Sequence, residues 1–147
     1  MKRFGIFLLL LLVFSPAFVQ AQDERIGSIK TVAGEVFVLR GGETLIAEAA
    51  TVLYRGDQLK TGETGRVGVI FRDDTRLSLG GNSDLAVEQF EFAPGEGRLG
   101  LVLRLARGMA AFVSGQISKL APDAVRLETP VGTVGVRGTH FVMNVVG

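Results

Sequence analysis

Short runs of alternating apolar residues, separated by tight turns, fill the stretch from residue 55 to residue 90, and this pattern constrains the fold most. The alternation occurs three times, at residues 67–71, 77–79 and 85–87. An apolar residue at every second position predicts a strand with one face on a core. The breaks at Asp73-Asp74 and Gly80-Gly81-Asn82 are typical of turns, because these residue types accept positive φ or bond to the local backbone. We therefore predict short strands stacked by tight turns.

The N-terminus has the pattern of a secretory signal peptide. A basic start at Lys2-Arg3 precedes an apolar run over residues 4–14, and Ala21 stands just before an abruptly polar segment. The alternative is an anchor that stays in the membrane, but the run is well short of the ~20 residues that a spanning helix needs. We therefore predict a signal peptide at residues 1–21, a flexible polar lead-in at 22–28 and a domain at 29–147.

Charge and composition bear on location and partners. Cleavage would remove Lys2 and Arg3, so that 16 basic against 15 acidic residues becomes 14 against 15. No block is basic enough to suggest nucleic acid as a partner, and no second apolar segment approaches spanning length. The chain has no Cys, so disulfides and a lipidated N-terminus are excluded and an apolar core must supply stability. We expect a periplasmic or secreted protein without a membrane span after cleavage.

The remaining chain also predicts strands. Leu99, Leu101, Leu103 and Leu105 alternate with other residues, which favours a long strand because leucines two apart would lie on opposite sides of a helix. Pro130 is expected at a bend or strand edge, since it donates no ladder hydrogen bond. Further strands are predicted at 29–33, 34–40, 109–114, 125–129, 131–139 and 141–146, with turns at Gly41-Gly42 and Arg107-Gly108.

Two segments are less regular. Residues 44–54 are rich in Ala and could form a helical turn, but flanking turns and the lack of a 3.6-residue period favour an irregular strand or loop. Residues 115–124 read as a loop whose apolar pair, Ile117 and Leu120, makes it a second candidate for a short helix.

The strand pattern leaves two arrangements open. A glycine precedes a predicted strand three times, at Gly34, Gly108 and Gly132. A repeat of this kind suits a solenoid-like stack of strands, although glycines commonly precede strands in any β protein. We predict an all-β fold of short stacked antiparallel strands, as a sandwich or a solenoid-like domain.

No residue pattern indicates catalysis. His140 is the single histidine and lies at the start of a strand, where a structural or exposed role is expected. Asp73 and Asp74 are adjacent, so they point to opposite faces in a strand or cap the backbone in a turn, although a partner carboxylate from distant sequence stays open. Arg55-Gly56-Asp57 spells an adhesion tripeptide that reads better as a turn. We predict no enzyme activity, no catalytic or metal-binding residue and no cofactor.

Several ordered motifs resemble the periplasmic domain of the FecR family. The first is Gly56-Asp57 followed by Thr61-Gly62, then an apolar strand that ends at Phe71, then Asp74-Thr75 and alternating leucines. The later ones are Leu105-Ala106-Arg107-Gly108, which looks like the family's Leu-x-x-Gly turn, and the segment from Thr129-Pro130 through Arg137-Gly138-Thr139 to Phe141. The resemblance covers about residues 32–146. Its motif residues are expected to be mainly structural: Gly56, Asp57, Thr61, Gly62, Phe71, Asp74, Gly108, Pro130, Gly138 and Thr139.

The resemblance implies an all-β fold and a role in protein–protein signalling with a receptor's signalling domain, as in the anti-sigma regulators of the family. Other members are exported proteins that carry the domain alone or beside wall-binding modules. This chain departs from the regulators because its apolar N-terminal helix looks like a signal peptide, and because Asp73-Asp74 replaces the usual Asp-Gly. It also stops at Gly147, where family members commonly continue, so either the domain is short or an edge is left open.

We therefore predict a non-enzymatic extracytoplasmic interaction or scaffold module whose partner is another, unidentified extracytoplasmic protein, with self-association through the last strand as a further outcome. The expected contact residues are Arg137, Val142, Asn144 and Val146, because an exposed last strand suits β-strand addition. Gly138 should make a bulge or corner beside Arg137. The alternative is a carbohydrate or cell-wall binding module, for which the chain offers no Trp and only Tyr54 as an aromatic platform of that kind.

Overall fold

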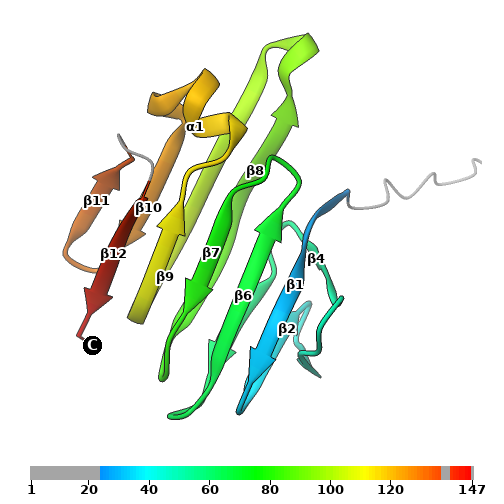
Figure 1. Ribbon diagram of the computed structural model, residues 1–147, viewed down its shortest axis with the longest axis vertical. Coiled ribbons are helices and arrows are strands. Elements are labelled where there is room, and N and C mark those ends of the chain that lie inside the picture. Colours follow the sequence, from blue (N-terminus) through cyan, green and yellow to red (C-terminus); the bar gives the residue numbers. More distant parts are fainter. Residues whose placement is uncertain (1–23, 137–139, 147) are drawn as a thin grey trace, which may run out of the picture.

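The computed structural model describes residues 24–136 and 140–146 of the chain (Figure 1). The predicted signal peptide and the corner at Arg137, Gly138 and Thr139 lie outside these ranges, and the division into residues 1–21, 22–28 and 29–147 stays a prediction. The strands are β1 (Arg25–Ala33), β2 (Val36–Arg40), β3 (Glu43–Ile46), β4 (Val52–Tyr54), β5 (Gln58–Thr61), β6 (Arg66–Phe71), β7 (Arg76–Leu79), β8 (Asp84–Ala93), β9 (Arg98–Val113), β10 (Val125–Thr129), β11 (Gly132–Gly135) and β12 (His140–Val145). The helices are the 3₁₀ turns η1 (Pro94–Glu96) and η2 (Pro122–Ala124) and the short α1 (Gln116–Leu120).

The fold is all-β, as predicted, and its strands form one sheet that curls over on itself at β9 (Figure 1). The first part of β9 pairs with β8 and β10, and the last part pairs with β7 and β12. We call the half ordered β4-β1-β6-β7-β9-β12 sheet A and the half ordered β3-β2-β5-β8-β9-β10-β11 sheet B. Among the described strands the β10–β9 pair is parallel and the others are antiparallel.

The core lies between the two halves. The alternation that predicted β6 and β7 holds, since the inward residues Val67, Val69 and Phe71 are buried and those between them are more exposed. Phe71 of sheet A stacks on Phe90 of sheet B, with ring centroids 5.7 Å apart. The leucines of β9 add Leu101, Leu103 and Leu105 to the same cluster. Burial of this kind contributes roughly 1.5–3 kcal/mol for each large side chain.

The predicted turn at Arg107-Gly108 is wrong, because β9 runs without interruption from Arg98 to Val113. Gly108 has φ +100°, and Ser83 packs where a Cβ on Gly108 would lie. The glycine therefore marks the position at which one continuous strand exchanges its partners in sheet B for those in sheet A.

The other local predictions largely match the structure. Gly41 and Gly42, with φ of +55° and +82°, connect β2 to β3 in a tight turn, and residues 47–51 form the irregular link that follows β3. The candidate helix at 115–124 contains α1, whose Ile117 is buried while Leu120 is exposed. Strand β1 begins at Arg25, so part of the segment expected as a flexible lead-in is already paired with β4 and β6.

Candidate functional site

The outer edge of β12 is the candidate interaction site. Along one side, β12 pairs with β9, with Val142 opposite Ala111 and Met143 opposite Ala110. Within the described ranges no strand pairs with its other side. In Figure 1 it lies at the left margin of sheet A, beside the β10–β11 hairpin. The strand at 141–146 was predicted, and the structure places it at an open edge.

The hydrogen bonds of Met109 fix which way the backbone of β9 faces. Its carbonyl oxygen accepts from the N–H of Gly80 at 2.9 Å, and its own N–H donates to Oγ of Ser83 at 3.1 Å. Both groups therefore point towards the β7 side. Because backbone groups alternate in direction along an antiparallel strand, those of Ala110 and Phe112 must point towards β12.

The same alternation assigns the backbone of β12. Phe141 and Met143 stand opposite Phe112 and Ala110, so their N–H and C=O groups bond to β9. The groups of His140, Val142 and Asn144 consequently point away from β9, towards the open edge. Two of the residues predicted for partner contact, Val142 and Asn144, thus present their backbone there.

The side chains of β12 also alternate, between the core and the outward face of sheet A. Phe141 stacks on Phe112 with ring centroids 5.1 Å apart, and Met143 packs against the core. Val142 is 60% exposed and Asn144 is also exposed. Val146, just beyond the strand, is 91% exposed. A partner strand at this edge would meet Val142 and Asn144 on the outward face of sheet A.

Segment 140–146 lacks the features that usually protect an edge. It contains no Asp, Glu, Lys, Arg or Pro, whereas edge strands of monomeric proteins are commonly blunted by charge, Pro or bulges. β-branched and aromatic residues give it a high β-propensity. An uncharged edge of this kind is open to pairing with another strand.

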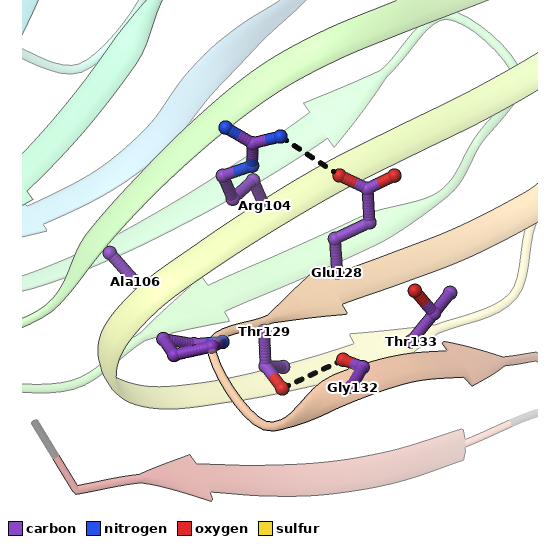
Figure 2. Close-up of a pocket in the computed structure, with 7 residues that line it drawn as sticks. Arg104, Ala106, Glu128, Thr129, Gly132 and Thr133 are labelled. Atoms are coloured by element: carbon purple, nitrogen blue, oxygen red, sulfur yellow. Dashed lines mark hydrogen bonds and ion pairs between the residues drawn. The ribbon is translucent and has the colours of Figure 1, made fainter.

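Two hollows lie around the β10–β11 hairpin, and one of them borders β12. One, of about 360 Å³, has walls from Val131, Val134 and residues 143–146. The other, of about 480 Å³, lies between β9 and the turn of the hairpin, and no residue of β12 lines it (Figure 2). There Arg104 pairs with Glu128 at 3.3 Å, and Oγ1 of Thr129 donates to the carbonyl oxygen of Gly132 at 2.8 Å.

The motif residues in the described ranges lie mainly in turns and the core. Asp57 is buried and accepts two hydrogen bonds from Arg40, at 2.9 and 2.7 Å, and one from the N–H of Tyr54. The hydrogen bond to Asp57 raises the pKa of Arg40, while burial lowers it. The guanidinium also stands 4.7 Å from the ring centroid of Tyr54. The ring named for the carbohydrate alternative is therefore partly covered.

A second group of motif residues supports the partner exchange in β9. Oγ1 of Thr61 donates to the carbonyl oxygen of Gly80 at 2.6 Å and accepts from the N–H of Ser83 at 2.9 Å. Gly62 binds the Glu35 carbonyl through its N–H, and Pro130 occupies the β10–β11 turn. The two Thr61 contacts tie the end of β5 to the segment from Gly80 to Ser83, which packs against Gly108.

Among the residues considered for catalysis, Asp73 and Asp74 accept hydrogen bonds from neighbouring groups, and His140 lies on a different element. Asp73 is fully buried, and its carboxylate accepts from the N–H and Oγ1 of Thr75 and from the N–H of Ile117. Asp74 adopts φ +69°, the left-handed conformation that the usual glycine would take, and accepts from Gln116. His140 lies exposed at the start of β12.

Sequence reasoning missed several exposed apolar residues near this edge. They are Met109 and Val113 on β9, and Val131 and Val134 on the β10–β11 hairpin. Alternation along β9 assigns Met109 and Val113 to one face, but the strand order decides that this face is uncovered. Together with Val142 and Val146, they gather apolar surface around the open edge.

Neither a metal site nor a spanning helix is found among the described residues. In residues 24–136 and 140–146 no group of three or more His, Cys, Asp or Glu side chains could hold a metal ion. Across the same residues, none of the helices has the length and apolar character needed to cross a membrane.

Comparison with known proteins gives one family and one structural likeness. The family model described as FecR protein matches residues 57–147. A solved structure described as a cell surface anchoring domain has 29% identity and a TM-score of 0.40, and the match covers 42% of this chain and 82% of that one. No curated protein matches the chain.

Proposed function

The chain belongs to the FecR protein family, and we propose that it acts in the periplasm or as a secreted protein, as a non-enzymatic module that binds another extracytoplasmic protein. One observation carries the proposal: β12 is paired on one side only in the described chain, and residues 140–146 include no Asp, Glu, Lys, Arg or Pro that would protect its other side. Such an edge provides the hydrogen-bonding groups that an added strand needs.

The binding mode is addition of a partner strand beside β12. The N–H and C=O groups of His140, Val142 and Asn144 would form the new ladder, and main-chain hydrogen bonds supply affinity in this mode. Specificity would come from side chains at alternate positions, here Val142 and Asn144, with Val146 at the end of the edge. The apolar hollow beside Val131 and Val134 could receive a side chain of the partner.

A matched pair of edge variants tests this mode. Val142→Lys places a charge at the β12 edge, and Ile46→Lys places the same charge on exposed β3, at the opposite outer edge of sheet B. The mature protein would be immobilised, a binding protein recovered from periplasmic extract and purified, and its Kd measured against each variant. We expect Val142→Lys to weaken binding about tenfold or more and Ile46→Lys to leave it unchanged.

The experiment has two outcomes that contradict the proposal. One is that no specific protein is recovered from the extract. The other is that Val142→Lys binds as well as the original chain while circular dichroism shows that both variants are folded. Concentration-dependent dimerisation that Val142→Lys abolishes would keep the edge as the site and identify a second copy of the chain as the occupant.

A further inference from the structure

The outward face of sheet A, away from the β12 edge, carries a separate charge pattern. The strands β1, β4, β6, β7 and β12 and residues 108–113 of β9 contain no Asp or Glu. They contain Arg25, Lys30, Arg66 and Arg76. By contrast, strands of sheet B carry both signs, with Glu88 and Glu128 around Arg104. Acidic side chains near sheet A lie outside its strands, so the charged residues within the strands are all basic.

A β-bulge in β1 brings polar side chains onto this face. Ile29 stands opposite Val69, but Thr31 stands opposite Gly68, so Lys30 is an extra residue in β1. Ile29 is buried, whereas Lys30 and Thr31 are both exposed. Without the bulge, Thr31 would share the inward parity of Ile29. Bulges re-aim side chains in this way and are frequent next to functional sites.

The bulge borders a shallow hollow of about 270 Å³ on the same face. Its floor is the backbone around Gly68, and Lys30, Arg76 and Ser78 stand around it. Oγ1 of Thr31 lies 2.6 Å from the position that a Cβ on Gly68 would take. Lys30, Arg76, Thr31 and Ser78 form no hydrogen bond or ion pair through their side chains among the described residues.

These four side chains make a set of donors suited to a phosphate group. An ammonium, a guanidinium and two hydroxyl groups can all donate to phosphate oxygens, and no carboxylate lines the hollow to oppose them. Arg66, exposed on β6 and paired with Ala33 of β1, adds a third cation to the same face at a distance from the hollow. The face therefore attracts more than a single anion.

The other half of the face is apolar. Cross-strand pairing places Val113 beside Arg76 and Ala111 beside Ser78. Met109 is 47% and Val113 39% exposed, and Val142 continues the apolar surface onto β12. In Figure 1 strands β1, β6, β7, β9 and β12 lie in front, and no helix covers them.

We propose that the outward face of sheet A binds a lipid surface that carries phosphate headgroups. The hollow at Lys30 and Arg76 would hold a headgroup phosphate, and Met109 and Val113 would contact the apolar boundary beneath the headgroups. Basic residues beside exposed apolar ones are the combination that holds proteins at anionic membranes. An acidic polypeptide would account for the cations but not for the adjoining apolar half. The hollow at Lys30 and Arg76 is distinct from the β12 edge, whereas the apolar half of the face adjoins that edge. The proposal does not depend on the proposed function.

Vesicle co-sedimentation of the mature protein tests the proposal. Vesicles of phosphatidylglycerol and phosphatidylcholine would be compared with vesicles of phosphatidylcholine alone, at several salt concentrations. We expect binding to the anionic vesicles only, weakening as salt rises. The double variant Lys30→Gln/Arg76→Gln should lose about tenfold or more in affinity. The control Arg98→Gln/Arg126→Gln removes the same charge from sheet B and should bind normally. Met109→Ser should weaken binding without altering its salt dependence.

Four results would overturn the proposal. The first is no binding to anionic vesicles, and the second is equal binding to neutral ones. The third is an equal loss of affinity in the sheet B control, since that would indicate net charge rather than a site. The fourth is tighter binding of polyglutamate or inorganic phosphate than of vesicles, which would assign the hollow to an acidic peptide or a free anion.

Discussion

Gly108 is the residue at which β9 changes partners, and its conformation is one that few side chains accept. Its φ of +100° is left-handed, and Ser83 fills the space where a Cβ would lie. Ser83 in turn binds the N–H of Met109. A glycine here is therefore needed for both backbone conformation and packing.

Gly108→Ala should lower the free energy of unfolding by about 3 kcal/mol, because backbone strain and a steric clash with Ser83 act together. Urea denaturation followed by circular dichroism measures the change. Gly95→Ala is the control, since Gly95 has open space around it and no positive φ, and it should stay within about 0.5 kcal/mol of the original protein. Equal stability of the two variants would contradict this role.

The buried carboxylate of Asp57 gives a second prediction at this scale. Asp57→Ala removes three hydrogen bonds and leaves Arg40 without its carboxylate partner, although Arg40 still donates to the carbonyl oxygen of Val52. We expect a loss of about 2 kcal/mol, less than for a fully buried pair because the Arg40 side chain is partly exposed. Glu96→Ala breaks the exposed pair with Arg98 and should cost about 0.5 kcal/mol or less. A similar cost for both variants in urea denaturation would rule out a special role for Asp57.

At the scale of the element, the alternation of backbone direction along β12 is measurable. In the isolated protein at low concentration, the amides of Phe141 and Met143 should exchange slowly, because they bond to β9. Those of Val142 and Asn144 should exchange quickly, because they face the open edge. Residue-resolved hydrogen exchange by NMR gives the rates. Uniform protection along β12 would mean that its outer edge is covered.

Strands with a regular alternation could be predicted from sequence, whereas their pairing could not. The inward positions of β6 are visible in the sequence because a strand repeats every two residues. The predicted turn at Gly108 was wrong, since a glycine between two apolar runs fits a turn and an exchange of strand partners equally well. The exposure of Met109 and Val113 depends on what covers their face, and only the strand order decides that. The bulge at Lys30 was likewise invisible, because it depends on the register against Val69 and Gly68.

The candidate site was predictable only in part, because it also depends on which strands pair. The last strand was expected to form an exposed edge, and Val142 and Asn144 lie on the side of β12 that no described strand pairs with. Which of its backbone groups face outward follows from the hydrogen bonds of Met109. The hollow beside it is formed by segments far apart in sequence, residues 131–134 and 143–146.

For the whole molecule, the shared strand predicts that both sheets unfold together. β9 contributes to both halves, and one apolar core joins them. Phe112→Ala, in the part of β9 that belongs to sheet A, should cost about 3–5 kcal/mol and lower the protection of amides in both sheets equally. Hydrogen exchange in moderate urea, with Leu85 in sheet B and Val69 in sheet A as reporters, measures this. Retained protection at Leu85 alone would show that the sheets unfold independently.

If a partner adds a strand to β12, hydrogen exchange of the β12 amides changes in the complex at alternate residues. With the purified partner bound, the amides of Val142 and Asn144 should slow by about a hundredfold or more, while those of Phe141 and Met143, already bonded to β9, change little. Unchanged exchange at Val142 and Asn144 in a saturated complex, with new protection on another strand, would contradict the account.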